Sequence, residues 1–357
     1  MKFVFDNIIF SLQKAGGISV VWYELLSRML NSGIKNYLFI EDLNCKNNIE
    51  RRKLTDVGKN LINVKFNRFN RYLDVSLKMD TKFIFHSSYY RICKNPNAIN
   101  ITTVHDFTYE YYSRGLKKIL HSWQKRRAIE KSDFIICISE NTKRDLLKFV
   151  PSVNPEKIKV IYNGVSNDYY VKTNISLLNI PFKSLEYVLF VGARDNYKNF
   201  RLAIEAISKS TKKIVIVGAP LNENEISFIE RTLKDTSKYY YAGRISNEEL
   251  NNLYNHAFAL LYPSIYEGFG IPVIEAQKAG CPVIAYNGSS IPEIVGDKSL
   301  LINELKSSEI CKRLDLLEDK EFRGEIIRKG LENSKRFSWD NMYEEIMEVY
   351  KRLWKGV

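Results

Sequence analysis

The sequence has no long uninterrupted run of apolar residues, although 45% of its 357 residues are hydrophobic and 27% are charged. No stretch approaches the roughly 18 to 20 apolar residues that a membrane-spanning helix needs. The chain also starts with a predicted strand, KFVFD, rather than with a basic and then apolar leader. These absences argue against a membrane-spanning helix and against a disordered chain. They predict a folded protein that stays in the cytoplasm.

Cysteines are few, and their spacing suits neither a disulfide framework nor a metal site. The five cysteines are odd in number, widely separated and without a C-x-x-C pair. Disulfide scaffolds and structural zinc sites both depend on regularly spaced, paired cysteines. The sequence therefore predicts reduced thiols and no bound metal. The cysteines are Cys45, Cys93, Cys137, Cys281 and Cys311.

Acidic residues are scarce only in the first half of the chain. Residues 1–170 hold 28 Lys and Arg against 16 Asp and Glu, whereas the remaining residues hold 26 against 25. A net charge of +13 suggests nucleic acid as a partner. However, no zinc-finger, helix-turn-helix or RNA-recognition signature accompanies the charge, so we expect no nucleic-acid partner and keep such binding only as the less favoured alternative.

One predicted helix, within residues 114–131, concentrates this positive charge and interleaves it with large apolar residues. A basic amphipathic helix can rest on anionic lipid head groups. We therefore expect peripheral contact with an anionic membrane through the first half of the chain, with an ordinary solvated face as the alternative. The basic residues are Arg114, Lys117, Lys118, Lys125, Arg126, Arg127 and Lys131, and the apolar ones are Leu116, Ile119, Leu120 and Trp123.

Both halves alternate short apolar strands with helical patterns, which is typical of parallel α/β sheets. The chain is long enough for two domains. The first half begins with a strand, a loop bearing Gly16 and Gly17, and an amphipathic helix. The second half restarts the alternation at EYVLFVG, after a loop-like stretch within residues 168–184. The predicted divisions are residues 1–170, residues 171–336 and a final helix of residues 337–357.

The most informative motif is EGFGIPVIE, which runs from Glu267 to Glu275 after the buried strand ALLYPS. Pro272 predicts the first turn of a helix and Gly280 its end. Backbone N–H groups at a helix start can point at an anion or at sugar hydroxyls, and glycine permits close approach. The spacing predicts a nucleotide-sugar pocket with Glu267 near the sugar and Glu275 near the ribose. Its other donor-binding residues are Gly268, Phe269, Gly270 and Ile271.

A second candidate site follows the strand EYVLFVG, in the segment VGARDNYKNF. Arg194 and Lys198 lie on the loop between this strand and the next helix. Open α/β sheets bind ligands at the carboxyl ends of their strands, and two cations four residues apart can clamp a diphosphate. They would offset the charge that develops on a leaving nucleoside diphosphate. Surface residues that merely cap a helix are the alternative.

Together these motifs resemble those of the retaining glycosyltransferases of family 4. The segment from Glu267 to Glu275 resembles the family's E-x7-E signature, and VGARDNYKNF resembles its G-x-R-x-x-Y-K-N segment. The resemblance extends over essentially the whole chain. It implies the GT-B fold, in which two Rossmann-like domains face a central cleft and the C-terminal helix crosses back to the N-terminal domain. It also implies that the first domain binds the acceptor and the second a nucleotide sugar.

The resemblance also implies roles for residues whose own sequence patterns are too weak to assign a function. His105, in TVHDF at the end of a strand, matches a family histidine beside the sugar and acceptor. There it would orient the sugar, or assist proton transfer if its pKa lies near the operating pH. Gly16 and Gly17 would bring backbone N–H groups to the donor phosphate, with a plain tight turn as the alternative. Arg244 and Ile245 would lie beside the nucleotide base.

The sequence also lacks D-x-D, the aspartate pair with which metal-dependent transferases of the other common fold hold a divalent ion. We therefore expect a metal-independent, retaining hexosyltransferase that needs no cofactor, with His105 and Glu267 as its catalytic residues. It would move a sugar from a nucleoside-diphosphate sugar to a hydroxyl of a glycan or lipid-linked acceptor, in surface polysaccharide biosynthesis. The motifs look mannosyltransferase-like. A GT-B-fold sugar-nucleotide epimerase or phosphorylase is the alternative.

Overall fold

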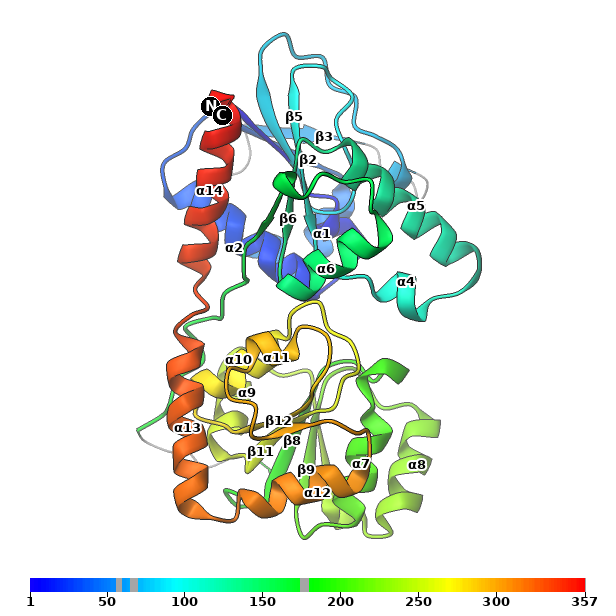
Figure 1. The fold of residues 1–357 in the computed structure, drawn as a ribbon, viewed down its shortest axis with the longest axis vertical. Coiled ribbons are helices and arrows are strands. Elements are labelled where there is room, and N and C mark those ends of the chain that lie inside the picture. The colour runs from blue at the N-terminus through cyan, green and yellow to red at the C-terminus, as the bar shows by residue number, and fades with distance from the viewer. Residues whose placement is uncertain (56–59, 65–69, 174–179, 357) are drawn as a thin grey trace. The chain divides into compact units, whose positions relative to one another are not determined.

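The computed structural model contains two α/β units (Figure 1). One unit combines Met1–Gly164 with Ser338–Val357, and the other is Val165–Phe337. Each unit is built on a parallel sheet covered by helices, so the predicted pair of Rossmann-like domains is confirmed. The structure describes residues 1–55, 60–64, 70–173 and 180–356.

The chain enters the second unit directly after Gly164, a few residues before residue 170. The Lys278 ammonium donates to the carbonyl of Ser166 (3.0 Å), and the Tyr170 N–H donates to the Asn251 side chain (3.1 Å). These bonds tie the first residues after Gly164 to the second unit. Of the loop-like stretch expected here, residues 174–179 lie outside the described residues.

Seven parallel strands form the sheet of the N-terminal unit among its described residues, in the order β3-β2-β1-β4-β5-β6-β7. Strands β1 and β4 at its centre are buried along their whole length, as expected for parallel strands that are covered on both faces. The sequence did not predict β3, which is only three residues long. The strands are β1 (Phe3–Asp6), β2 (Tyr37–Glu41), β3 (Leu61–Asn63), β4 (Phe83–Ser87), β5 (Ala98–Val104), β6 (Phe134–Cys137) and β7 (Ile158–Val160).

Some helices of this unit begin at glycine or at a side-chain cap, as α2 does after Gly16 and α3 after Asn48. The Ser139 hydroxyl accepts a hydrogen bond from the Thr142 N–H (3.0 Å) and so caps α6. The helices are α1 (Ile9–Leu12), α2 (Gly17–Asn31), α3 (Ile49–Lys53), α4 (Thr108–Tyr112), α5 (Gly115–Lys131) and α6 (Glu140–Phe149), with short 3₁₀ turns at Leu43–Asn47, Asn70–Tyr72 and Pro155–Lys157.

The C-terminal helix α14 (Trp339–Lys355) packs on the N-terminal unit beside α2, as predicted (Figure 1). Its Tyr350 is fully buried, and the Tyr350 hydroxyl lies 2.6 Å from Nδ1 of His86 on β4. The other ring nitrogen of His86 lies 2.9 Å from the Thr103 hydroxyl on β5. His86 therefore links the helix to two strands of the sheet.

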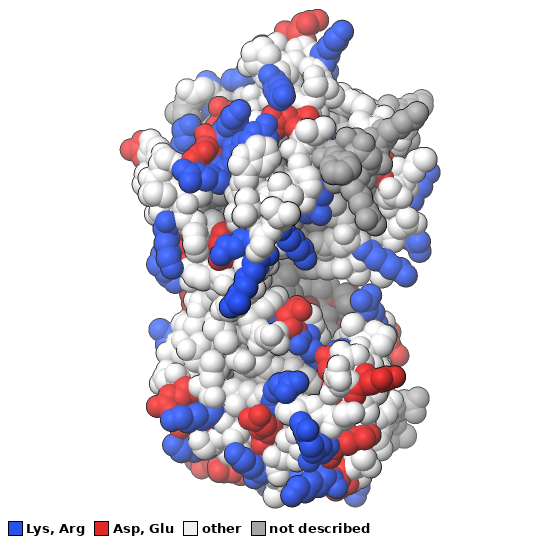
Figure 2. Space-filling model, turned by 90° about the vertical axis from the view of Figure 1, so that its right-hand side faces the viewer, with Lys and Arg blue, Asp and Glu red and all other residues white. Residues whose placement is uncertain are grey.

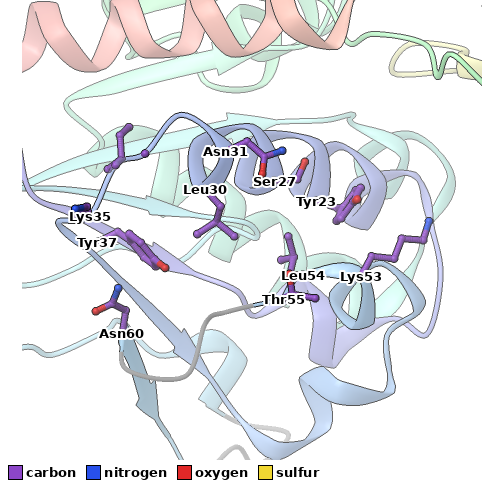
Figure 3. Close-up of a pocket in the computed structure, with 12 residues that line it drawn as sticks. Tyr23, Ser27, Leu30, Asn31, Lys35, Tyr37, Lys53, Leu54, Thr55 and Asn60 are labelled. Carbon is purple, nitrogen blue, oxygen red and sulfur yellow. The ribbon is translucent and has the colours of Figure 1, made fainter.

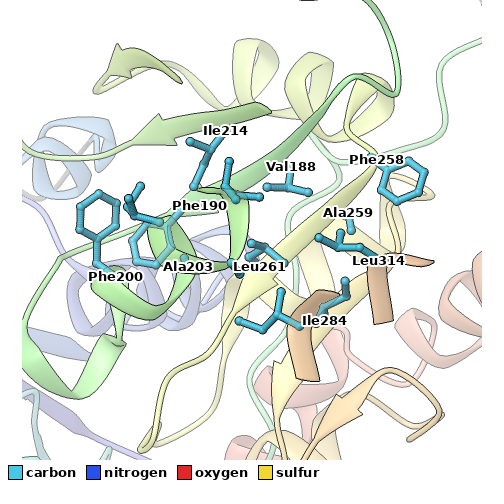
Figure 4. Packing of buried hydrophobic residues seen from close by; sticks show 14 of the residues in the cluster. Val188, Phe190, Phe200, Ala203, Ile214, Phe258, Ala259, Leu261, Ile284 and Leu314 are labelled. Carbon is cyan, nitrogen blue, oxygen red and sulfur yellow. The ribbon is translucent and has the colours of Figure 1, made fainter. Parts of the chain in front are cut away.

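Six parallel strands form the sheet of the C-terminal unit among its described residues, in the order β10-β9-β8-β11-β12-β13. Figure 4 shows Val188, Phe190 and Leu261 of its central strands packed with residues of the flanking helices. Of these strands, β13, which is two residues long, was not predicted from the sequence. The strands are β8 (Tyr187–Val191), β9 (Lys213–Val217), β10 (Tyr239–Gly243), β11 (Ala259–Tyr262), β12 (Val283–Tyr286) and β13 (Leu301–Ile302).

Two helices of this unit, α8 and α9, start with reciprocal capping boxes. Asn222 and Glu225 form the first, and Ser246 and Glu249 form the second. Each cap stabilises its helix start by about 1 kcal/mol. The helices are α7 (Phe200–Ser208), α8 (Glu223–Leu233), α9 (Asn247–His256), α10 (Ile271–Lys278), α11 (Ile291–Ile294), α12 (Ser307–Leu316) and α13 (Lys320–Ser334), with 3₁₀ turns at Asn196–Lys198 and Thr236–Lys238.

All five cysteines are free thiols. Burial raises the pKa of Cys45 and of Cys281 to about 12, so both stay protonated. In the described part of the chain, no helix is both long enough and apolar enough to span a bilayer. Within the same residues, no three His, Cys, Asp or Glu side chains cluster closely enough to hold a metal ion.

Candidate active site

The loops after β8 and β11 meet because these two strands are parallel neighbours in the second sheet. The Ile265 N–H donates to the carbonyl of Tyr197 (2.8 Å), and the Asn199 side chain donates to the carbonyl of Pro263 (2.9 Å). Asn199 adopts a left-handed conformation, with φ of 53°. The two loops therefore form one surface at the carboxyl edge of the sheet, where α/β proteins place ligands.

Lys198 and Glu267, predicted from two separate motifs, form an ion pair on this surface. The Lys198 ammonium lies 2.6 Å from Oε1 of Glu267, and the two side chains are only 17% and 11% exposed. The same ammonium lies 5.7 Å from the centre of the Tyr262 ring. The pair thus combines a fixed cation and a fixed carboxylate at a partly dehydrated position, where electrostatic interactions are stronger than in bulk water.

Two serines that the sequence analysis did not select hold the Glu267 loop in place. The Glu267 N–H donates to the Ser289 hydroxyl (2.9 Å), and the Ser290 hydroxyl lies 3.0 Å from the Glu267 carbonyl and 2.7 Å from that of Phe269. Both serines belong to the segment GSSIPEIVGD. The loop after β12 therefore positions the motif residues that follow β11.

Helix α10 begins at Ile271 and is followed by Gly280, as the sequence predicts. Gly270 precedes it with φ of 111°, and a Cβ there would lie 2.8 Å from the Ile291 side chain. The positive φ favours glycine at this position, and a Cβ would also displace the end of the Ile291 side chain. Together with Gly268, Phe269 and Ile271, it brings the backbone to the same surface as Glu267.

Glu275 lies in the second turn of α10, enclosed by two tyrosines. The Tyr254 hydroxyl lies 3.2 Å from the Glu275 carboxylate, and Tyr169 also hydrogen-bonds to it. Burial raises the pKa of Glu275 to about 7, while these hydrogen bonds work in the opposite direction. Near neutral pH the group is therefore close to its midpoint, and a ligand that donates hydrogen bonds to it would favour the carboxylate.

This titration predicts a pH dependence of donor binding. If Glu275 accepts hydrogen bonds from ribose hydroxyls, affinity for a nucleotide sugar should weaken as the pH falls from 8 to 6, because protonation through a pKa of about 7 removes the accepting carboxylate. A Glu275→Gln variant should bind more weakly at pH 8 and lose this dependence. Calorimetric titrations of both proteins at several pH values measure it. Equal pH profiles would contradict the assignment.

Arg194 and Lys198 make separate ion pairs. Nε of Arg194 donates to Oε1 of Glu225 (2.7 Å), and its Nη2 donates to the carbonyl of Pro220 (2.7 Å). Its side chain is only 5% exposed, and its Nη1 has no partner among the described residues. In this structure Arg194 therefore fastens the loop after β8 to α8, and Lys198 is the cation that accompanies Glu267.

A glycine lies at the carboxyl end of each of the neighbouring strands β8, β9 and β10. Gly192, Gly218 and Gly243 all have positive φ, and Gly218 is the tightly packed one. The Gly218 N–H donates to the Gly243 carbonyl (2.9 Å), and a Cβ on Gly218 would lie 2.5 Å from the Gly192 carbonyl oxygen. Arg244 is exposed and Ile245 is half-buried directly after Gly243. The predicted base-binding residues thus follow β10, two strands from β8.

The remaining predicted residues belong to the N-terminal unit. His105 follows β5 and is 7% exposed. Burial lowers its pKa to about 4, Asp106 opposes this change and Lys125 adds to it. His105 is therefore neutral at pH 7, which favours an orienting role over proton transfer. Gly16 precedes α2 in extended conformation, and a Cβ on Gly17 would meet no atom within 4 Å, so the fold itself does not require glycine at Gly17.

A cavity of about 520 Å³ lies elsewhere in the N-terminal unit, between α2, β2 and α3 (Figure 3). Tyr23, Lys35 and Lys53 line it, and none of the predicted site residues does. A smaller cavity of about 290 Å³ adjoins Arg194 and Glu225 in the C-terminal unit. Of these two cavities, only the second adjoins the predicted site.

Both halves of the chain match known protein families. The family described as Glycosyltransferase Family 4 matches residues 15–169, and the family described as Glycosyl transferases group 1 matches residues 179–333. The O-antigen chain mannosyltransferase B of Escherichia coli is 27% identical over 274 residues, which cover 71% of this chain and 70% of that protein.

Solved structures share the fold over the full length. The sucrose-phosphate synthase of Thermosynechococcus elongatus superposes with a TM-score of 0.76 at 16% identity, covering 100% of both chains. Anabaena HepE, solved in complex with UDP and glucose, superposes with a TM-score of 0.72 at 14% identity, covering 98% of this chain and 99% of that one.

The two parallel sheets and the C-terminal helix that returns to the N-terminal unit define the GT-B fold. With both family matches, the chain belongs to glycosyltransferase family 4 and is a hexosyltransferase.

Proposed function

We propose that the enzyme moves a sugar from a nucleoside-diphosphate sugar, bound by the C-terminal unit, to a hydroxyl of a glycan or lipid-linked acceptor, bound by the N-terminal unit. The anomeric configuration is retained, and the product belongs to a surface polysaccharide. The Lys198–Glu267 ion pair at the carboxyl edges of β8 and β11 carries this proposal. The O-antigen mannosyltransferase relative supports the product class and makes mannose the first donor sugar to test.

Each group of the site has a proposed task. Lys198 and the first turn of α10 stabilise negative charge on the departing diphosphate. Glu267, held by Lys198 and the loop after β12, stabilises positive charge that develops on the sugar. Arg194, Arg244, Ile245 and Glu275 hold the rest of the nucleotide. His105 orients the reacting sugar, and the N–H groups at Gly16 and Gly17 assist with the donor phosphate.

Product analysis tests this function. The protein is incubated with UDP- and GDP-sugars and a polysaccharide fragment or lipid-linked saccharide, and the linkage formed is assigned by NMR. A glycosidic bond with the anomeric configuration of the donor supports the proposal. Inversion at the anomeric carbon, turnover of the donor without an acceptor, or a requirement for free phosphate contradicts it.

Transfer is expected to proceed without a divalent ion, because fixed cationic side chains and helix dipoles offset the diphosphate charge. Dialysis against EDTA should therefore leave the initial rate within about two-fold of its untreated value, whereas loss of a catalytic metal would cost several kcal/mol of transition-state stabilisation. The assay compares EDTA-treated enzyme with and without added Mg²⁺ or Mn²⁺. Loss of activity with EDTA and its recovery with metal would contradict the mechanism.

We further propose that the outer face of α4 and α5 contacts an anionic membrane. Leu116 is 77% exposed and Trp123 is 51% exposed, and basic residues flank them. Figure 2 shows this side of the protein, with Lys and Arg beside uncharged residues over the N-terminal unit. The prediction that Lys125 belongs to this basic surface is wrong. Its side chain is buried, and its ammonium pairs with the Glu110 carboxylate (2.7 Å). The exposed apolar residues are Tyr111, Tyr112, Leu116, Ile119, Leu120 and Trp123.

Sedimentation with liposomes checks this contact. Vesicles rich in phosphatidylglycerol should bind the protein, and neutral vesicles should bind it far less. A Leu116→Asp, Trp123→Ala double variant should bind at least about 10-fold more weakly, since each side chain contributes more than 1 kcal/mol when buried. Leu316→Asp, at an exposed position of α12, serves as the matched control. Equal binding to both kinds of vesicle would contradict the proposal.

A further inference from the structure

A separate pocket of about 280 Å³ opens in the N-terminal unit, among the loops that follow β1, β4 and β5 and the helices α4 and α5. Its volume is near the lower end of the roughly 300 to 1,000 Å³ of typical ligand sites, which suits a single small ligand such as one sugar ring. The side chains used in this inference are those of Arg71, Tyr89, Tyr90, Asp106, Tyr109 and His121.

Two polar side chains of this pocket have unused hydrogen-bonding groups. His121 is only 4% exposed, and its Nε2 lies 2.7 Å from the Tyr89 hydroxyl. Within the described residues, its Nδ1 has no hydrogen-bond partner, and neither does Nε of Arg71. An unsatisfied buried polar group costs about 1 to 3 kcal/mol. Their position in a pocket points to a ligand that completes these bonds.

The protonation state of His121 indicates what kind of ligand fits. Burial lowers its pKa to about 3, with Lys125 as a further cause, so the ring is neutral at pH 7. Depending on the tautomer, Nδ1 then either donates or accepts a hydrogen bond. A hydroxyl group can serve as partner to both forms, whereas a phosphate oxygen could accept only from one. The ring therefore favours a hydroxyl-bearing ligand.

The Asp106 carboxylate gives the pocket a hydrogen-bond acceptor for ligand hydroxyls. Burial alone would raise the pKa of Asp106, but Lys125, the Thr108 N–H and His105 together lower it, so Asp106 is ionised. The Lys125 ammonium already donates to the Asp106 carbonyl (2.8 Å) and to Glu110 (2.7 Å). Lys125 is thus the main cation that acts on Asp106, and Arg71 and Lys117 are further cations near His121. A carboxylate accepts well from vicinal hydroxyls, and it repels an anionic ligand.

The aromatic residues complete a surface suited to a sugar ring. The Tyr109 and His121 rings are stacked, with centroids 3.7 Å apart and an interplanar angle of 11°. Tyr89 and Tyr90 pack together with centroids 4.9 Å apart. Phenol rings offer both apolar area and hydroxyl groups, which match the two kinds of surface on a pyranose.

We propose that this pocket binds one neutral sugar residue of the acceptor glycan. The inference rests on the proposed function and adds the place and chemistry of acceptor recognition. Asp106 accepts from sugar hydroxyls, while His121 and Arg71 supply the remaining polar contacts. Asp106 directly follows His105 in the chain, so the segment that carries the proposed orienting histidine also contributes to this pocket. Helix α5 contributes His121 from its inner face and Leu116 and Trp123 on its outer face.

Ligand-observed NMR with methyl glycosides tests the pocket directly. The full chain is titrated with the methyl glycosides of mannose, glucose, galactose and N-acetylglucosamine. At least one should bind at millimolar concentration, and Asp106→Asn should weaken this binding at least about 10-fold through loss of the accepting charge. Asp80→Asn, at an exposed position of the same unit, should leave it unchanged. Arg71→Met provides a second pocket variant if Asp106→Asn does not fold.

The outcomes separate this inference from the proposed function. Protection of the same proteins by nucleotide sugars against thermal unfolding should be equal in wild type and in both pocket variants. Binding of no methyl glycoside, or equal binding by the wild type and a folded pocket variant, overturns the sugar pocket. Absence of any nucleotide-sugar protection in the wild-type protein would instead contradict the proposed function and leave the glycoside result standing.

Discussion

Replacement of Lys198 or Glu267 by alanine is expected to lower the rate of sugar transfer by at least about 100-fold, the usual effect of removing one electrostatic group that stabilises a transition state. Each change removes one member of a mostly buried ion pair and leaves its partner misplaced. Because the two residues act as a unit, the double variant should lose little more than either single variant. Initial rates with saturating donor and acceptor measure the effect.

A second ion pair in the same unit provides the matched control. Lys213 and Glu186 lie 3.0 Å apart at the opposite end of the sheet, and both are about one-third exposed. Lys213→Ala should retain near-normal transfer. Circular dichroism and thermal melts should show that all variants remain folded. Near-normal transfer by Lys198→Ala or by Glu267→Ala would remove that residue from the mechanism.

Gly164→Ala is expected to destabilise the N-terminal unit by about 3 kcal/mol, at the upper end of ordinary overpacking effects. A Cβ on Gly164 would lie 2.2 Å from the Trp339 N and 2.6 Å from the Ser338 carbonyl carbon. These are backbone atoms at the start of α14, so they cannot move aside as a flexible side chain would. The variant should loosen α14 from the sheet and lower the melting temperature by several degrees.

Gly324→Ala on α13 is the control for this change. A Cβ there meets no atom within 4 Å, and alanine in a helix is favoured over glycine by about 0.5 to 1 kcal/mol. This variant should therefore be as stable as the wild-type protein or slightly more stable. Differential scanning calorimetry of the three proteins makes the comparison. Equal stability of Gly164→Ala and wild type would show that α14 does not pack as described.

Much of the fold could be predicted because the central strands are buried on both faces, and their sequences therefore consist mostly of apolar residues. The edge strands at Leu61–Asn63 and Leu301–Ile302 are too short for such a signal. Helix α13 was missed for another reason, since its buried face includes Gly330 and Asn333. The Asn333 amide donates to Gln277 (2.8 Å) and to the Ile294 carbonyl (2.8 Å). A polar buried face leaves no apolar periodicity to detect.

The site could be predicted only in part, because motifs identify residues but not their partners. Lys198 and Glu267 were both selected, yet their direct contact spans 69 positions and depends on the pairing of β8 with β11. The orientation of the Arg194 side chain depends on its ion pair with Glu225, which belongs to the capping box of α8. Likewise, Ser290 contacts the Glu267 loop from the loop that follows β12. Such contacts come from sheet order, which short motifs do not encode.

The central claim is that the loops after β8 and β11 bind the nucleoside-diphosphate part of the donor. The most direct measurement is the thermal unfolding of wild type and Lys198→Ala in the presence of a panel of UDP- and GDP-sugars. Ligand at 100 times its dissociation constant stabilises the native state by about 2.7 kcal/mol. We expect at least one nucleotide sugar to raise the melting temperature of the wild type by several degrees and to leave that of Lys198→Ala almost unchanged. Equal protection of both proteins, or protection of neither, would contradict the account.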